Sequence, residues 1–356
     1  MRPAATAAAI TAINTDMKNK VLVGLSGGID STYVCKYLSE NGYEVLGIFL
    51  RFHEYADPRD AEAVAKKLGI SFSTADYTGL FKKIVKKNFV DEYASGRTPN
   101  PCIICNREVK FHALMEQADK YGCDLAATGH YVNIVRENGN CILKCGADPR
   151  KDQSYVLWNL RREILPRLIM PMGSFEKEEV KKQLFGQGIL PDTMEESQEI
   201  CFIPDNDYIS YVQSVKGEFP PGDFVDSDGN VIGKHSGIIR YTIGQRKRLG
   251  AFGRPAFVSA INPENNTITI GFGDEIMQDK ITVDNLNFVS CEPFEGEDEF
   301  EVKPRYKAPP TPARVKVENG VAYVEFSSPV RAPAPGQSAV FYKGDILMFG
   351  GLIRRG

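Results

Sequence analysis

One turn restricts the fold of this chain more than any other feature: Gly24-Leu25-Ser26-Gly27-Gly28-Ile29-Asp30-Ser31. The apolar run Lys20–Leu25, where the turn begins, predicts a strand. After the turn, a helical pattern continues to Leu38. Two adjacent glycines let backbone N–H groups turn inward, so the turn and the helix N-terminus form a concave anion site. The sequence therefore predicts a strand–turn–helix unit that binds phosphate groups.

The alternation of strands and helices continues along the first half of the chain. Val45–Leu50 and Asp124–Thr128 predict strands, and Asp60–Leu68 predicts a helix. This order is typical of βαβ units around a parallel sheet, which makes the fold class α/β. Ligands of such sheets bind beyond the carboxyl ends of the strands, so we expect the turn, Leu50 and Gly129-His130 to line one crevice.

The sequence pattern changes near Pro220, where short alternating runs replace helical periodicity. The predicted organisation is a disordered Ala-rich tail (1–18), a parallel-sheet domain (19–211), a small β-rich central domain (212–277) and a C-terminal β-barrel (278–356). Within the tail, Met17 is an alternative start.

Composition excludes several classes of protein. The formal net charge of −3 argues against a chain that coats nucleic acid with one basic surface, so a polyanion must be met by local basic patches. No apolar run reaches the ~18 residues that span a bilayer. Eight cysteines in a chain of this length are typical of a reducing cytoplasm. We therefore expect a cytoplasmic protein with neither a membrane nor DNA as its partner.

The phosphate turn is not the usual P-loop, because no Gly-Lys-Ser/Thr sequence ends it. The pattern resembles the pyrophosphate loop of ATP pyrophosphatases, which hold the β- and γ-phosphates and expose the α-phosphate to attack. Ser26 and Ser31 add hydroxyl donors, and Asp30 is expected to cap the helix or to help hold Mg²⁺. The alternative is a tight structural turn in which Asp30 is an ordinary N-cap.

A second cluster of chemically active residues is the CxxC of Thr98–Asn106, with Cys201 nearly a hundred residues later. A CxxC can be a redox pair, half of a zinc site or part of an iron–sulfur site. Zinc would need Cys141 and Cys145, which lie ~13 Å apart along a predicted strand and cannot both reach one ion. The remaining cysteines are interpreted as small buried hydrophobes: Cys35, Cys123 and Cys291.

With these motifs together, the chain resembles the tRNA-specific 2-thiouridylase family from about residue 19 to the C-terminus. The resemblance rests on seven segments in one order: GLSGGIDS, GRTPNPCIICNREVKF, ATGHY, KDQSYVLWNL, ICFIPD, YTIGQRKRLG and PGQSAVFY. It implies an N-terminal adenine-nucleotide α-hydrolase-like domain, a central domain and a β-barrel around the tRNA anticodon stem-loop. It also implies a reaction: the 2-oxygen of the wobble uridine in tRNAs for Lys, Glu and Gln attacks MgATP, and sulfur then displaces AMP.

The resemblance assigns roles to individual residues. It implies that Cys201 carries a persulfide, obtained from a sulfur donor, and that Cys105 assists sulfur release by forming a disulfide. It places ATP at Gly24 to Ser31, Leu50 and Gly129, and the target base at Asn100, Pro101 and Cys102. The remaining tRNA contacts that it implies are His130, Lys151, Asp152, Gln153, Arg305, Tyr306 and Gln337.

One position departs from the family pattern. Members usually carry Asp where this chain has Cys102, and a thiol with a pKa near 8.5 cannot replace a carboxylate in acid–base work. The change gathers three thiols, Cys102, Cys105 and Cys201, in one predicted site. We therefore hypothesise a [4Fe–4S] cluster on these three residues as the alternative to the persulfide relay.

Basic and aromatic residues suggest further RNA contacts. Lys82-Lys83 and Lys86-Lys87 share a predicted helix face, which is either solvated or faces phosphates. Arg246-Lys247-Arg248 is the better candidate for phosphate contacts. Tyr155 and Trp158 are expected in the core.

Two other functions fit part of the sequence. A ligase that adenylates a small carboxylate would use the phosphate turn and leave the cysteines and the β-rich half unexplained. A non-catalytic RNA-binding or sulfur-carrier protein would not need the intact Ser26–Ser31 turn.

Overall fold

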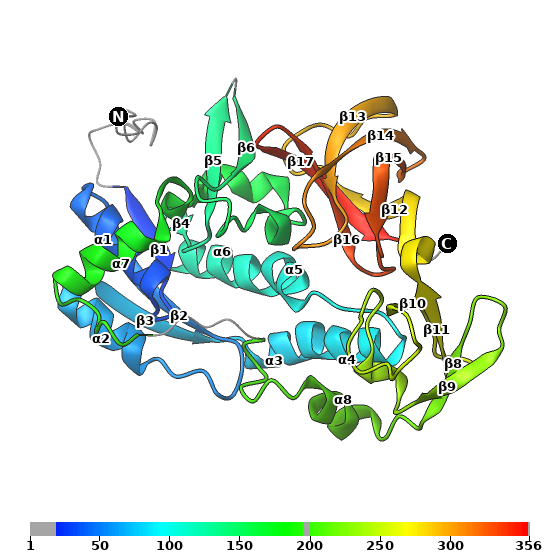
Figure 1. Ribbon diagram of the computed structural model, residues 1–356. Helices are drawn as coiled ribbons and strands as arrows, with labels where there is room; N and C mark the ends of the chain where they lie inside the picture. Colours follow the sequence, from blue (N-terminus) through cyan, green and yellow to red (C-terminus); the bar gives the residue numbers. More distant parts are fainter. Residues whose placement is uncertain (1–18, 138, 195–199, 355–356) are drawn as a thin grey trace.

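The computed structural model describes residues 19–137, 139–194 and 200–354. They form an α/β part, a small β-sheet and a β-barrel, in that order along the chain (Figure 1). The predicted tail over residues 1–18 lies outside the described residues. Within the described ranges, no helix is both long and apolar enough to cross a membrane.

The α/β part is built on five parallel strands in the spatial order β3-β2-β1-β4-β7. Their bounds are β1 (Lys20–Gly24), β2 (Glu44–Arg51), β3 (Ser71–Asp76), β4 (Leu125–Ala127) and β7 (Leu168–Ile169). Successive side chains of β1 enter opposite apolar clusters, Val21 and Val23 on one face and Leu22 on the other. The parallel α/β fold predicted from the sequence is confirmed.

Helices cover both faces of this sheet (Figure 1). One face packs against α1 (Ile29–Glu40), α2 (Arg59–Leu68) and α7 (Lys177–Gly186) through aliphatic side chains such as Val34, Val64 and Val180. The other face packs against α6 (Phe111–Lys120) through Phe111 and Leu114. The 3₁₀ turns of this part are η3 (Ser154–Leu157), η4 (Arg162–Arg167) and η5 (Pro171–Ser174).

Two helical stretches each contain a π-helical turn. The first runs through α3 (Thr78–Phe81), η1 (Lys82–Lys86) and α4 (Lys87–Ala94), and the second through α5 (Pro101–Cys105), η2 (Asn106–Lys110) and α6. The π-turn changes the helical period, so Lys86 is buried while Lys82, Lys83 and Lys87 are exposed. The prediction that all four lysines share one face was therefore wrong.

The central sheet has the order β10-β11-β8-β9, in which only the β11–β8 pair is parallel among the described strands. It follows α8 (Tyr208–Lys216), which packs against the α/β part through Val212. The strands and short turns are β8 (Gly222–Val225), β9 (Val231–His235), η6 (Ile238–Arg240), β10 (Ala256–Asn262), β11 (Thr267–Phe272) and η7 (Gly273–Ile276).

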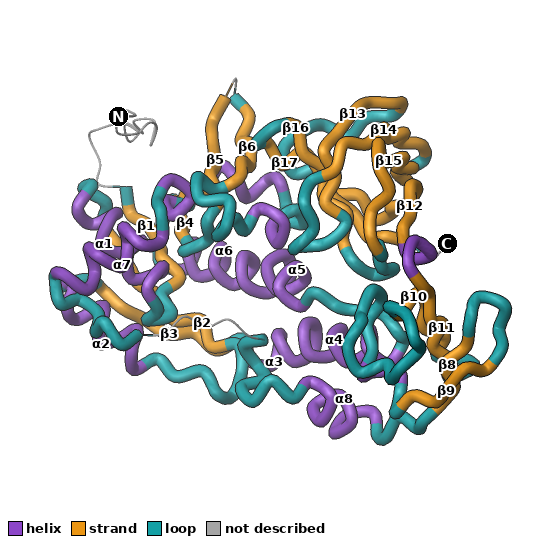
Figure 2. Tube along the Cα trace, viewed as in Figure 1, coloured by secondary structure: helices purple, strands orange, loops and turns teal. Residues whose placement is uncertain are grey.

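The C-terminal strands close into a six-stranded antiparallel barrel, because β12 pairs with both β15 and β17. Its interior is apolar, with Phe341 and Phe349 stacked at a centroid distance of 4.1 Å. The strands are β12 (Met277–Asn287), β13 (Gly296–Lys303), β14 (Thr311–Glu318), β15 (Val321–Arg331), β16 (Ser338–Lys343) and β17 (Ile346–Ile353). Figure 2 shows these strands at the end of the molecule opposite α1, α2 and α7.

A hairpin of the α/β part joins the barrel to the rest of the protein. The hairpin consists of β5 (Val132–Glu137) and β6 (Asn140–Cys145), and β6 pairs with β17 through Lys144–Ile346 and Leu143–Leu347. Trp158 and Tyr155, predicted in the core, are buried beneath this junction and donate hydrogen bonds to Ser338. The barrel is thereby fixed against the edge of the α/β part that carries the candidate site.

Candidate active site

The phosphate loop, residues 24–31, connects β1 to α1 as the sequence predicts. Gly27 has φ +86°, and a Cβ there would lie 2.8 Å from the backbone N of Ala61, so only glycine fits this turn. The Ser26 N–H donates to Ser31 Oγ at 3.2 Å, and the Ser31 hydroxyl donates to the Gly28 carbonyl at 3.1 Å. The curvature of the loop is therefore fixed by its own hydroxyl groups and by contact with α2.

Asp30 does not act as predicted at the start of α1. The N-cap is Gly28, without a side-chain capping bond. The Asp30 carboxylate instead accepts hydrogen bonds from Lys177 Nζ, at 2.7 and 2.8 Å, and from the Tyr131 hydroxyl at 2.8 Å. Lys177 is 5% exposed and compensates the negative charge beside the loop, which removes the repulsion expected for an incoming phosphate.

The carboxyl ends of β2, β1 and β4 bring the expected crevice residues to one edge of the sheet. Leu50 is half-buried near the end of β2, and Gly129 follows β4. A Cβ on Gly129 would lie 2.9 Å from Asp30 Cβ and 3.1 Å from the Ser31 backbone N. The first turn of α1 therefore rests directly on Gly129, which gives this glycine a packing reason for its identity.

His130 is buried beside this edge. Its Nδ1 lies 2.7 Å from Thr128 Oγ1, and its ring stacks on Phe111 at 5.7 Å. Burial, and secondarily the charge of Lys110, lowers the pKa of His130 well below its ordinary value. The imidazole is therefore neutral at physiological pH, and its assignment as a tRNA contact stays a prediction.

The thiol site comprises Cys102, Cys105 and Cys201 with Lys110. Cys102 is exposed at the start of α5, whereas Cys105, one turn later, is buried in an apolar cluster that includes Phe81 and Phe202. Burial raises the pKa of the Cys105 thiol to about 12. Cys201 is exposed. Partial burial of its thiol and then the neighbouring Cys102 raise the pKa of Cys201, while Lys110 lowers it.

Lys110 connects the two regions. It ends η2, and its positive charge lowers the pKa values of Cys105, Cys201 and His130. Lys86, which ends the other π-turn and pairs with Glu54 at 2.7 Å, also lowers the pKa of Cys201. Two lysines therefore favour anionic sulfur at Cys201. The sequence singled out Lys86 only as one of four lysines on a predicted helix face, and it did not single out Lys110.

The described residues include no group of three or more His, Cys, Asp or Glu side chains that could hold a metal ion. Cys105 is enclosed by apolar side chains, while Cys102 and Cys201 are exposed. The hypothesis of a [4Fe–4S] cluster on these three thiols stays a prediction. The Asp30 carboxylate, expected either to cap the helix or to help hold Mg²⁺, accepts hydrogen bonds from Lys177 and Tyr131.

Tyr306 and Asp152, two of the implied tRNA contacts, lie together at the thiol site. The Tyr306 hydroxyl donates to the Asp152 carbonyl at 3.4 Å, and 41% of the Tyr306 surface is exposed. Burial of the hydroxyl, Asp152 and Cys102 raise the pKa of Tyr306, so its ring belongs to the surroundings of Cys102. An exposed aromatic side chain beside a reactive thiol is suited to stack on a base.

The other implied tRNA contacts have structural partners or remain half-buried. The Gln153 side-chain carbonyl accepts from the Tyr131 N–H at 3.0 Å, and the Asp152 carboxylate accepts from the Gly146 N–H at 3.0 Å. Arg305 has a buried Nε without a hydrogen-bond partner among the described groups. The half-buried contacts are Asn100, Pro101, Lys151 and Gln337.

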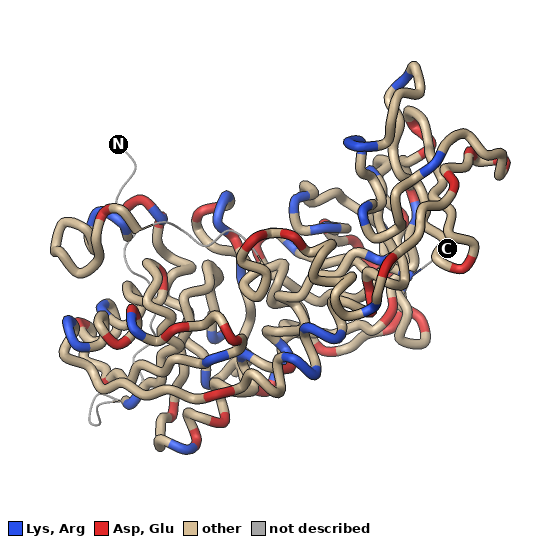
Figure 3. Tube along the Cα trace, turned by 90° about the horizontal axis from the view of Figure 1, so that it is seen from below, with Lys and Arg blue, Asp and Glu red and all other residues tan. Residues whose placement is uncertain are grey.

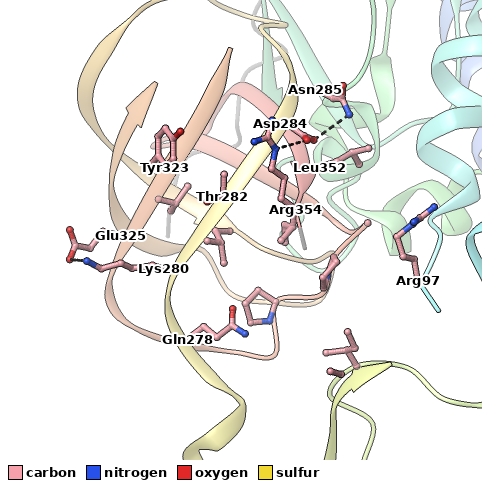
Figure 4. A pocket seen from close by; sticks show the side chains of 18 of the residues that line it. Arg97, Gln278, Lys280, Thr282, Asp284, Asn285, Tyr323, Glu325, Leu352 and Arg354 are labelled. Carbon is pink, nitrogen blue, oxygen red and sulfur yellow. Dashed lines mark hydrogen bonds and ion pairs between the residues drawn. The ribbon is translucent and has the colours of Figure 1, made fainter. Parts of the chain in front are cut away.

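A large cavity of about 1010 Å³ lies elsewhere, between the barrel, the central sheet and the segment from Glu92 to Arg97 (Figure 4). No residue of the phosphate loop or the thiol site lines it. Its walls carry internally paired charges, such as Arg354–Asp284 and Lys280–Glu325, which compensate one another. This cavity therefore lies away from the phosphate loop and the thiol site.

Charged residues of both signs are distributed over all three parts of the chain (Figure 3). This pattern agrees with the small net charge and with recognition of a polyanion through local patches. Arg246, Lys247 and Arg248 are exposed in a loop of the central part. Their contact with tRNA phosphates stays a prediction.

Comparison with known proteins decides the family. Residues 19–205 match the tRNA methyl transferase HUP domain, 209–272 the tRNA methyl transferase PRC-barrel domain, and 278–353 the aminomethyltransferase beta-barrel domain. The tRNA-specific 2-thiouridylase MnmA of Clostridium perfringens is 42% identical over 353 residues, which cover 94% of this chain and 98% of that protein. The chain belongs to the tRNA-specific 2-thiouridylase family. The resemblance inferred from its motifs is confirmed.

Other relatives agree with this assignment. The tRNA-specific 2-thiouridylase MnmA of Acetivibrio thermocellus is 42% identical, with 95% of this chain and 99% of that protein covered. The enzyme of the same name from Clostridioides difficile is 40% identical, with 95% of this chain and 99% of that protein covered. This chain therefore spans nearly the full length of the relatives.

Proposed function

We propose that this protein is an ATP-dependent tRNA-uridine 2-sulfurtransferase that replaces the 2-oxygen of the wobble uridine in tRNAs for Lys, Glu and Gln with sulfur. The observation that carries the proposal is a chain of contacts between the two regions: Gly129 packs against Asp30 and Ser31 of the phosphate loop, and the charge of Lys110 influences the neighbouring His130 as well as the thiols of Cys105 and Cys201. The names of the relatives support tRNA as the substrate. Thiolation, the reaction in the names of these relatives, would give the cysteines of this chain a role. Methyl transfer, the reaction in the names of two of the matching domain families, would leave the cysteines unexplained.

Adenylation is the first step. The phosphate loop would hold the β- and γ-phosphates through its backbone N–H groups and the hydroxyls of Ser26 and Ser31. The uracil 2-oxygen attacks the α-phosphorus, pyrophosphate leaves, and AMP becomes bonded to that oxygen. AMP is a far better leaving group than oxide, which is why the carbonyl must be activated.

Sulfur transfer is the second step. A sulfur donor loads Cys201 with a persulfide. A thiol from the Cys102–Cys105 turn attacks the inner sulfur of this persulfide, forms a disulfide with Cys201 and releases the terminal sulfur as sulfide, and a dithiol reductant then reduces the disulfide. Sulfide attacks carbon 2 of the adenylated base, and the C–O bond to AMP breaks. Lys110 and Lys86 would stabilise anionic sulfur at this position, and Tyr306 would stack on the extruded base.

The test is whether nucleotide turnover depends on tRNA. The protein is incubated with ATP, magnesium and a persulfide donor, with and without unmodified tRNA, and pyrophosphate, AMP and 2-thiouridine are measured. We expect 2-thiouridine, AMP and pyrophosphate in equal amounts, and only with tRNA. Pyrophosphate release that needs a small carboxylate instead would favour the ligase, and tRNA binding without ATP consumption would favour the non-catalytic alternative.

A further inference from the structure

Lys86 is a buried lysine in a stretch of otherwise exposed lysines. Only 8% of its surface is exposed, whereas Lys82, Lys83 and Lys87 are exposed. Its inward position follows from the π-turn η1, which Lys86 ends. An ammonium group inside a protein is strongly disfavoured unless its charge is compensated. The groups that surround this ammonium therefore decide what Lys86 can do.

The first of these groups is Glu54, in the loop that follows β2. Lys86 Nζ donates hydrogen bonds to both carboxylate oxygens of Glu54, at 2.9 and 2.7 Å. The Glu54 side chain is 59% exposed and that of Lys86 only 10%, so the ion pair joins a buried cation to a surface loop. Burial, and then the charge of Lys86, lowers the pKa of His53, so the neighbouring imidazole does not add a second cation.

The second group is a pair of aromatic rings. Lys86 Nζ lies 5.8 Å from the ring centroid of Phe202 and 6.0 Å from that of Tyr211. The two rings contact each other edge to face at 5.6 Å. A cation at this distance is attracted to a ring, and more strongly where water is excluded. Phe202 is 2% exposed and directly follows the exposed Cys201, so Lys86 holds the residue next to the expected sulfur carrier.

We propose that Lys86 is a positioning residue for sulfur transfer, which ties the Cys201 segment to the loop after β2 and keeps a cation beside the sulfur that Cys201 carries. This inference rests on the proposed function and concerns a lysine to which the family resemblance assigns no role. Leu50, an implied ATP contact, lies near the end of β2. The same strand would thereby serve adenylation directly and sulfur transfer through Glu54 and Lys86.

The charges around Cys201 agree with this role. Burial and the Cys102 thiol raise the pKa of Cys201, while Lys110 and Lys86 lower it. The two lysines end separate π-turns, η2 and η1, so they approach the sulfur from different helices. Sulfur leaves Cys201 as an anion whichever thiol attacks the persulfide. A fixed cation therefore favours the step without deciding between Cys102 and Cys105.

The experiment compares full-length wild type with Lys86→Met, Lys86→Arg and Glu54→Gln. Lys120→Met is the matched control, because the exposed Lys120 loses a comparable ring contact, 5.3 Å from Tyr121. Alkylation of Cys201 by iodoacetamide is followed against pH by mass spectrometry, without ATP or tRNA. Protein loaded with inorganic polysulfide is then mixed with ATP, magnesium and unmodified tRNA, and pyrophosphate and 2-thiouridine are measured in one turnover. Thermal unfolding shows which variants are folded.

Lys86→Met should move the alkylation midpoint to higher pH and slow 2-thiouridine formation at least about tenfold. The pyrophosphate burst should stay within about threefold of the wild type. Lys86→Arg keeps the positive charge and should restore most of both losses. Glu54→Gln removes a negative charge and keeps the ammonium, so its alkylation midpoint should move to lower pH. Lys120→Met should match the wild type in every measurement.

An unmoved midpoint or an unchanged thiolation rate in a folded Lys86→Met would overturn the inference, as would equal losses in Lys86→Arg. A rise of the midpoint in both Lys86→Met and Glu54→Gln would also overturn it, because loosened packing moves both in one direction. If Lys86→Met does not fold, Glu54→Gln decides, and a midpoint that does not fall contradicts the role of Lys86. Absence of 2-thiouridine from the wild type would refute the proposed function instead, and alkylation would still test the charge of Lys86 at Cys201.

Discussion

The phosphate loop and the thiol site are built in different ways. The phosphate loop is one continuous segment whose hydroxyls bond to its own backbone, whose Gly27 packs against α2, and whose last residues rest on Gly129. The thiol site combines α5, the segment 200–203 and the barrel loop that carries Tyr306, which are far apart in sequence. The first is a preformed unit, whereas the second exists only when three parts of the chain pack together.

This difference implies that the two half-reactions can be separated. Changes in the thiol site should stop sulfur transfer and leave adenylation, and changes around the phosphate loop should stop adenylation first. A variant that fails in both half-reactions from a single thiol-site change would show that the two regions are one unit.

The largest separation is expected for Cys201→Ser. Thiolation should fall by about 1000-fold or more, because the hydroxyl cannot carry sulfur. The tRNA-dependent pyrophosphate burst should stay within about threefold of the wild type, since the phosphate loop is untouched. Quenched-flow assays measure pyrophosphate release and 2-thiouridine formation. Equal losses of the two products would contradict the separation of adenylation from sulfur transfer.

Gly129→Ala should affect adenylation next most strongly. The added Cβ meets Asp30 Cβ at 2.9 Å and the Ser31 backbone, so the first turn of α1 must shift. We expect the pyrophosphate burst to slow about 100-fold, the typical cost of misplacing reacting groups by about 1 Å. Gly186→Ala is the matched control, because a Cβ there meets open space, and it should leave the burst unchanged.

Lys177→Met should weaken the support of the phosphate loop. Asp30 would lose the ammonium group that lies 2.7 Å from its carboxylate. The free energy of unfolding should fall by about 1–3 kcal/mol. This loss is smaller than the usual cost of breaking a buried ion pair because the Asp30 side chain is 32% exposed. Urea unfolding measures this loss. Lys182→Met, on the exposed side of the same helix, serves as control, and an equal stability of the two variants would contradict the role of Lys177.

Lys110→Gln should have the smallest effect, seen in pH dependence. The pKa of Cys201 is raised by burial and lowered by Lys110, so alkylation of Cys201 increases with pH up to this pKa, and loss of Lys110 moves the midpoint to higher pH. At neutral pH the thiolate fraction, and with it the alkylation rate, should fall severalfold. Lys87→Gln, an exposed lysine paired with Asp91, should not move the midpoint.

The sequence predicted features that local residues decide. The parallel sheet, the position of the phosphate loop, the buried Trp158 and the barrel followed from periodicity and turn residues. Features that depend on distant packing were missed: Lys177 reaches Asp30 across 147 positions, and β6 of the α/β part pairs with β17 of the barrel. The burial of Lys86 was mispredicted because a π-turn changes the helix period, which spacing alone does not reveal.

The candidate site was predicted as a set of residues, but not as an arrangement. The motifs named the three cysteines, and the structure adds that Cys105 is buried while Cys102 and Cys201 are exposed. Such a distinction depends on the cluster around Phe81 and Phe202, whose members come from separate segments. The roles of the individual thiols and of the implied ATP and tRNA contacts stay predictions.

The central claim is that the uracil 2-oxygen leaves on AMP before sulfur takes its place. The most direct measurement uses tRNA with oxygen-18 at the 2-position of the wobble uridine and analyses the AMP by mass spectrometry after a single turnover. The account predicts that AMP carries the heavy oxygen in an amount equal to the 2-thiouridine formed. Unlabelled AMP alongside 2-thiouridine would show that the oxygen leaves by another route and would contradict the account.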